Sequence, residues 1–245
     1  MKKTVKVLCL TAMLIGVGSA AQAQFRQSVY LNGNIPTGDF ASDASTVSDG
    51  TIAALVGNGV PLTYEQVGKD ASVGFGLGYR ASYRFDVGVG MVAPFANVDF
   101  LWNTISGKWR DKYSDAYYST PTYFNIPFLA GVTYIYDELP WDDISAYGEF
   151  GIGTDLLWIT SEGKGDGNEY FGYKADFAFA WMLGAGAYFG EHFSAGLYYY
   201  SFGTHNIDYT QYTLDNNTLA AAQANLHGRE RRSAGSVMIR LGFHF

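Results

Sequence analysis

The sequence is poor in cysteine, in lysine outside a few short stretches, and in long apolar runs. Its only cysteine among 245 residues is Cys9. Cys9 lies in an amino-terminal stretch with the features of a secretory signal, so export would remove it. We therefore expect no disulfide, no thiol nucleophile and no thiolate metal site in the mature protein.

The amino-terminal stretch at residues 1–23 is predicted to be a signal peptide. It carries Lys2, Lys3 and Lys6, then an apolar run over 7–17, then a small-residue site that ends at Ala23. The run is shorter than the roughly 20 apolar residues that a membrane-spanning helix requires. We expect cleavage after Ala23, which leaves one mature domain over residues 24–245.

Basic charge is also scarce. The chain has 16 lysines and arginines against 23 aspartates and glutamates, a net charge of −7. Three of the basic residues lie in the predicted signal, so the mature chain carries −10. A chain this acidic, with no basic run beyond 229–232, is a poor candidate for binding nucleic acid.

What the sequence does contain is aromatic residues in a period of two. Aromatic side chains make up 17% of the chain, with 19 tyrosines and 17 phenylalanines. In the stretch ASVGFGLGYRASYRF (71–85), apolar side chains at odd positions alternate with glycine, serine and arginine. Such alternation predicts strands with one apolar face. Eight strands are predicted, at 25–37, 72–85, 89–104, 122–136, 144–160, 176–189, 192–205 and 233–245.

The segments between these strands alternate between long and short. Long loops are expected at 38–71, 105–121, 161–175 and 206–232, and short turns between them, which is typical of an up-and-down meander. Within 213–232, leucines and alanines at helical spacing predict a short helix. This helix would either bind a partner or pack on the end of the fold that the strands form.

The placement of charge indicates which strand face points outward. No strand contains a lysine; the five lysines beyond the predicted signal lie in the long loops (Lys69, Lys108, Lys112, Lys164 and Lys174). A soluble sheet would place charges on its polar face, whereas these polar faces hold mainly glycine, serine, asparagine and tyrosine. The apolar faces are free of charge over about ten residues, enough to cross a bilayer. We expect an all-β fold, an eight-stranded antiparallel transmembrane β-barrel with its apolar face toward lipid and its lumen filled by side chains.

The carboxyl-terminal sequence SVMIRLGFHF alternates to the end and finishes on an aromatic residue. It resembles the assembly signal of bacterial outer-membrane barrels, in which Phe243 and Phe245 would be read by the barrel assembly machinery. The chain as a whole resembles small outer-membrane barrels of the outer-membrane protein A and X type. The segments SVYLNGNIPTGDF (28–40), YFNIPFLAGVTY (123–134) and YGEFGIGTDL (147–156) are similar to the PorT-like barrel family. The resemblance implies a Gram-negative outer membrane and a monomer in lipid.

Charged residues on the inward faces are the candidate site. Arg80, Glu149 and Arg240 fall on inward faces, and their positions along the strands predict one common depth in the lumen. We expect Glu149 to pair with Arg80, with Arg240 or with both, and Arg84 to lie nearby as a further cation. This cluster would plug the lumen.

No catalytic, cofactor or metal residues are predicted. His205 and Asp208 could form part of a dyad, but the surroundings suggest an ordinary loop histidine. The stretch DGNEY (166–170) lacks a full calcium-loop pattern. We therefore expect a non-enzymatic surface protein with a structural or adhesive role, which could meet an extracellular ligand or host surface through its loops. A small-solute channel and an outer-membrane lipid-modifying enzyme are the alternatives.

Overall fold

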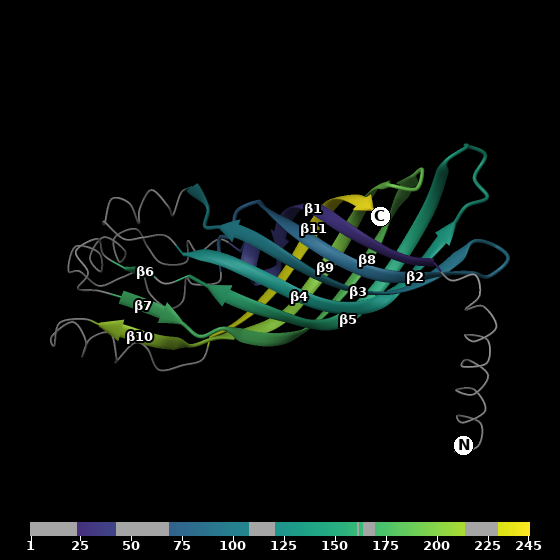
Figure 1. Cartoon of the computed structure of the whole chain (residues 1–245). Helices are drawn as coiled ribbons and strands as arrows, with labels where there is room; N and C mark the ends of the chain where they lie inside the picture. Colours follow the sequence, from purple (N-terminus) through teal and green to yellow (C-terminus); the bar gives the residue numbers. More distant parts are fainter. Residues whose placement is uncertain (1–23, 43–68, 108–120, 161, 164–169, 214–229) are drawn as a thin grey trace, which may run out of the picture.

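Eight long strands close into one antiparallel barrel in the computed structural model (Figure 1). The structure describes residues 24–42, 69–107, 121–160, 162–163, 170–213 and 230–245. The strand order around the barrel is β1-β11-β9-β8-β5-β4-β3-β2, so neighbours in sequence are neighbours in space. The barrel strands are β1 (Gln24–Thr37), β2 (Gly74–Asp86), β3 (Met91–Thr104), β4 (Thr122–Tyr136), β5 (Ile144–Ile159), β8 (Asp176–Phe189), β9 (Phe193–Ile207) and β11 (Glu230–His244). The predicted fold class is confirmed, and each strand end lies within three residues of its predicted position.

The first and last strands form the seam of the barrel. Strands β1 and β11 pair over ten positions, from Ser28 opposite His244 to Thr37 opposite Gly235. Beyond the strand end, the Gln27 and Phe245 backbones exchange two hydrogen bonds of 3.0 and 2.9 Å. Because the sheet closes on itself, it has no free edge whose backbone groups lipid would leave unsatisfied.

The outside of the barrel is apolar, as the alternation predicts. On β2, Phe75 and Leu77 are 53% and 63% exposed, whereas Arg80 faces inward and is 3% exposed. The same pattern holds on the other strands, and the outward aromatic rings pack side by side, as in the stack of Phe124 on Trp158 with centroids 5.1 Å apart. An exposed face of this kind is stable in hydrocarbon and not in water.

The two ends of the barrel differ. We call the turn end the one where the short connections at 87–90, 137–143 and 190–192 gather, at the right of Figure 1. The opposite end, at the left of Figure 1, is the loop end. It carries a second, three-stranded sheet in the order β10-β7-β6, made of β6 (Glu162–Gly163), β7 (Tyr170–Tyr173) and β10 (Tyr209–Thr213).

This small sheet corrects the expectation that 161–175 and 206–232 are loops throughout. Strands of two to five residues are too short for the alternation of apolar residues to reveal them. Strands β9 and β11 also extend into the second of these segments, to Ile207 and from Glu230. Their backbone pairing continues beyond the point where the apolar alternation stops. The helix predicted within 213–232 falls mainly on 214–229, which lies outside the described residues, as does the predicted signal at 1–23.

A short 3-10 helix, η2 (Gly38–Ala41), folds over the loop end directly after β1. Phe40 is 1% exposed and its ring lies 4.8 Å from that of Tyr123 on β4. Asp39 holds η2 to β11, because its carboxylate accepts hydrogen bonds of 2.9 Å from both the backbone N–H and the hydroxyl of Ser233. The first long connection therefore begins by covering the lumen.

No helix among the described residues has the length and apolar character that a membrane span needs.

Candidate functional site

An ion pair between Arg80 and Glu149 crosses the lumen. The guanidinium donates two hydrogen bonds to the carboxylate, Nη1 to Oε2 at 2.6 Å and Nη2 to Oε1 at 2.7 Å. Arg80 is on β2 and Glu149 on β5, and two strands separate these in the barrel order. Thr133 on β4 donates a further hydrogen bond of 2.9 Å to Glu149. Two opposite walls of the barrel are thus joined by a buried, bidentate contact.

A second ion pair, between Arg240 and Asp99, crosses the lumen from β11 to β3. Arg240 Nη2 lies 2.9 Å from Asp99 Oδ2 and 3.0 Å from Oδ1, and both residues are fully buried. Asn32, Asn97 and Tyr200 complete the shell around Asp99, with hydrogen bonds of 3.1, 2.7 and 3.0 Å to its carboxylate.

The two pairs form one charge-balanced cluster. Arg240 Nη1 lies 3.9 Å from Glu149 Oε1, so the second cation also interacts with the first anion. Two arginines therefore face two carboxylates. Aromatic rings fill the space around them: the guanidinium carbon of Arg80 lies 4.0 Å from the centre of the Phe95 ring, and that of Arg240 lies 4.6 Å from that of Tyr30. We call these four side chains the lumen cluster: Arg80, Asp99, Glu149 and Arg240.

Sequence reasoning missed Asp99, and the expectation that Arg84 lies near the cluster as a further cation stays a prediction. The carboxylate that directly pairs with Arg240 is Asp99, and Glu149 is only its more distant neighbour. The alternation of β3, with Val98 and Phe100 on the other face from Asp99, could have identified it as an inward acid. Arg84 lies nearer the turn end, where its guanidinium carbon is 4.8 Å from the centre of the Tyr188 ring.

A backbone bulge brings His205 into the lumen near the loop end. Along β9 the inward positions are even, through Tyr198 and Tyr200 to Phe202. Gly203 then adopts a φ of 82°, and the pairing with β11 skips one residue between Gly235 and Ala234. The extra residue reverses the alternation. His205, an odd position that would otherwise face lipid, therefore points inward and is fully buried.

Two carboxylates lie beside the His205 ring. Nε2 is 3.2 Å from Asp155 Oδ2 on β5, and Nδ1 is 3.5 Å from Asp176 Oδ2 on β8. Both aspartates are distant from His205 in sequence, and the spacing of residues does not indicate them as its neighbours. The candidate dyad partner named from the sequence is Asp208, which lies three residues after His205. Within the part of the chain that the structure describes, no three His, Cys, Asp or Glu side chains are arranged to hold a metal ion.

A third polar group lies below the lumen cluster, toward the turn end. The His244 ring sits between two serine hydroxyls, with Nδ1 2.7 Å from Ser28 Oγ and Nε2 2.8 Å from Ser194 Oγ. The ring is 2% exposed and packs against Tyr188. A hydrolase needs an accessible serine whose histidine is oriented by an acid. Here the histidine is buried and the contacts of its two ring nitrogens are serines.

The two terminal phenylalanines lie on the lipid side of the last strand. Phe243 and Phe245 are 43% and 52% exposed, and their ring centroids are 6.2 Å apart. Phe243 also packs against Phe193 on β9, with centroids 5.6 Å apart. An assembly factor could therefore read both rings from the membrane side, although their role in assembly stays a prediction.

No family model matches the chain, and no curated protein matches it in sequence. Several solved structures are similar to it. The attachment invasion locus protein Ail of Yersinia pestis is 11% identical, with 90% of this chain and 97% of Ail covered and a TM-score of 0.41. Neisserial surface protein A is 10% identical over 91% of this chain and 99% of its own, with a TM-score of 0.39. The amino-terminal barrel domain of Pseudomonas aeruginosa OprF is 11% identical over 91% and 99%, with a TM-score of 0.32.

The geometry of the chain itself identifies the kind of protein. Eight antiparallel strands close without an edge, short turns gather at one end, and an apolar exterior rich in aromatic rings surrounds a polar, side-chain-filled lumen. These are the features of small barrels of the bacterial outer membrane. The chain is an integral outer-membrane β-barrel of the eight-stranded type.

Proposed function

We propose that this protein is a non-enzymatic, monomeric surface barrel that acts through the connections at its loop end. The observation that carries the proposal is the lumen cluster. Two buried ion pairs cross the lumen, and the rings of Tyr30, Phe95, Tyr198 and Tyr200 pack around the arginines. Eight strands enclose a space that side chains fill, which supports a role at the ends of the barrel rather than transport through it, and the long connections lie at the loop end.

The proposal places the loop end outside the cell and the turn end in the periplasm, as is usual for barrels of this class. Limited proteolysis of intact cells tests this orientation. Cleavage is expected within 38–71 or 206–232 and not within 137–143, where the chain forms a short turn on the periplasmic side. Cleavage at 137–143 in intact cells would show that the barrel is inverted.

Adhesion is the form of surface role that we propose, with an extracellular ligand or host surface as the partner. A suitable test expresses the protein in a Gram-negative host that lacks it, beside a variant in which 214–229 is replaced by a Gly-Ser linker. Adherence of the cells to immobilised matrix proteins is expected to fall in the variant. A matched control replaces 138–142 in the turn end and is expected to keep full adherence.

The same cells separate the two alternatives. A change in the mass spectrum of lipid A on expression of the protein would indicate a lipid-modifying enzyme. Faster uptake of small solutes would indicate a channel. If adherence of the linker variant equals that of the parent protein, the adhesive role is wrong.

A further inference from the structure

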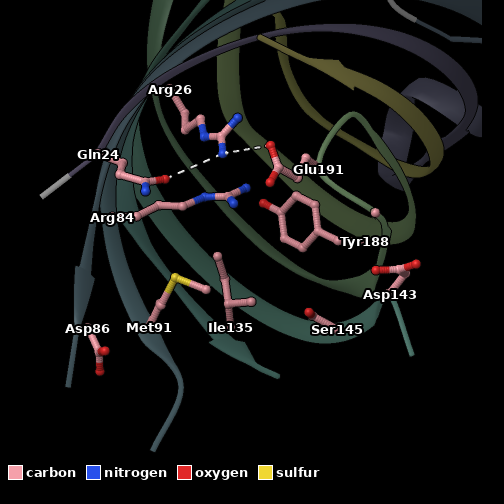
Figure 2. Close-up of a pocket in the computed structure, with 11 residues that line it drawn as sticks. Gln24, Arg26, Arg84, Asp86, Met91, Ile135, Asp143, Ser145, Tyr188 and Glu191 are labelled. Atoms are coloured by element: carbon pink, nitrogen blue, oxygen red, sulfur yellow. Dashed lines mark hydrogen bonds and ion pairs between the residues drawn. The ribbon is translucent and has the colours of Figure 1, made fainter. Parts of the chain in front are cut away.

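A cavity of about 740 Å³ opens at the turn end of the barrel (Figure 2). Its walls come from six barrel strands and two of the short turns, so it is the mouth of the lumen rather than a groove on the outside. Above it the lumen is filled by the His244 group and by the lumen cluster. The lining residues include Gln24, Arg26, Arg84, Met91, Ile135 and Tyr188.

Arg84 is the cation in this cavity that has no anionic partner. Its guanidinium lies over the Tyr188 ring and, among the described residues, makes no hydrogen bond or ion pair. Arg26, on the same side of the cavity, is already engaged, with Nη2 3.6 Å from Glu191 Oε2 and 3.4 Å from Gln24 Oε1 (Figure 2). Arg84 therefore presents free donors that are held in place by an aromatic ring, an arrangement suited to a planar carboxylate.

The rim of the cavity limits how much negative charge a ligand can carry. Asp86, Asp143 and Glu191 lie around the opening. They would repel a polyanion, while one carboxylate could still reach Arg84. The neighbouring wall is apolar: Met91 is partly exposed in the cavity, and Ile135, which is 1% exposed, lies beside it and backs this wall. A ligand that fits both features carries one negative charge next to an apolar group.

We propose that this cavity binds the carboxyl terminus of a short peptide whose last side chain is apolar. The carboxylate pairs with Arg84, the apolar side chain packs on Met91, and the peptide backbone has Gln24 and Ser145 as polar neighbours. A volume of about 740 Å³ is typical of sites for small ligands and admits a few residues, not a folded domain. The ligand enters from the end opposite to the proposed adhesive surface, so this site is independent of the adhesive role.

Isothermal titration calorimetry on the barrel, refolded in a nonionic detergent, tests the proposal whatever the orientation in the membrane. The probe is the tripeptide acetyl-Gly-Ala-Leu with a free carboxyl terminus, compared with the same peptide as its carboxyl-terminal amide. The acid is expected to bind at least about tenfold more tightly than the amide, since a hydrogen-bonded charge is lost. Its affinity should fall as salt is added.

Three variants extend the experiment. Arg84→Gln is expected to reduce affinity for the acid at least about tenfold, and Arg84→Lys to retain part of it. Arg231→Gln, on an exposed side chain at the loop end, is the matched control and should bind like the parent protein. Heat-induced gel shifts verify that each variant is folded.

Equal binding of acid and amide, full affinity in Arg84→Gln, or no binding at millimolar peptide would each overturn the proposal. Hexanoate and inorganic phosphate distinguish other sources of the anion. If either binds as tightly as the peptide acid, the site recognises a fatty acid or any small anion, and the peptide assignment is wrong.

Discussion

Arg240 Nη2 lies 2.9 Å from Asp99 Oδ2, and this contact joins β11 to β3 across the centre of the barrel. Both side chains are buried, and Asn32 and Tyr200 hydrogen-bond to both of them. Replacing such a pair by apolar residues can be neutral, whereas removing one partner leaves an uncompensated charge. The lumen cluster therefore makes each of its members difficult to replace alone.

Asp99→Asn is expected to lower the free energy of unfolding by about 3–5 kcal/mol, and less where water reaches Arg240. Glu149→Gln should have an effect of the same order, because it leaves Arg80 unpaired. Urea titration of the barrel in lipid vesicles, followed by gel shift, measures both. Asp142→Asn in an exposed turn is the control, with a change within about 0.5 kcal/mol. Unchanged stability in both lumen variants would contradict the ion-pair assignment.

His205→Leu is expected to destabilise the loop end by about 2–4 kcal/mol, because it removes the imidazole that lies beside the buried Asp155 carboxylate. His192→Leu, in the turn between β8 and β9, is the matched control and should lower the free energy of unfolding by less than His205→Leu does. Gly203→Ala should resemble His205→Leu, since a β-carbon at φ 82° is strained and the bulge turns His205 inward. Hydrogen exchange of the β8 and β9 amides near Asp176 would reveal the loss. Normal protection in both variants would contradict this account.

Asp39 predicts a dependence on pH at the loop end. The backbone N–H and the hydroxyl of Ser233 hold the pKa of the Asp39 carboxyl below its usual range. A lowered folded-state pKa gives stability that is present above the unfolded pKa, near 4, and is lost as the pH falls through the folded value. The protection factors of the amides at 38–42, which are corrected for the intrinsic exchange rate at each pH, should therefore fall as the pH is lowered from 5 to 3. Asp39→Asn should show low protection at both pH values; a pH response that survives in this variant would rule out Asp39 as its cause.

Leu77→Arg tests the lipid-facing assignment. Leu77 is 63% exposed on β2 and lies between Phe75 and Tyr79 on the same face. An arginine at mid-membrane costs about 2–4 kcal/mol, so the variant should unfold at lower urea concentration in vesicles. Val87→Arg in the turn between β2 and β3 is the control and should be nearly neutral. A Leu77→Arg barrel as stable as the parent would mean that this face does not contact lipid.

The sequence was sufficient to predict the eight-stranded barrel, because a period of two is directly visible in each long strand. It was also sufficient to place Arg80 and Glu149 on inward faces, since Arg80 lies between Tyr79 and Ala81 and Glu149 precedes the outward Phe150. The register between strands was not visible, and register determines that Asp99, not Glu149, directly meets Arg240.

Local irregularities of the backbone were the second reason why parts of the structure could not be predicted from the sequence. The bulge at Gly203 reverses the alternation of β9, so a pattern read along the strand assigns His205 to the wrong face. The strands of the small sheet are too short for any period to appear. Pairings between distant segments, such as Asp39 with Ser233, leave no trace in the spacing of residues along the chain.

The central claim is that side chains close the lumen, and the conductance of single barrels in a planar lipid bilayer tests it most directly. Purified protein, with folding verified by the gel shift, is added to a membrane under an applied voltage. The account predicts no steady ion current through the parent barrel, because the lumen cluster and the rings packed around it fill the space that eight strands enclose. A steady, single-sized conductance step in the parent protein would contradict the account and favour a channel.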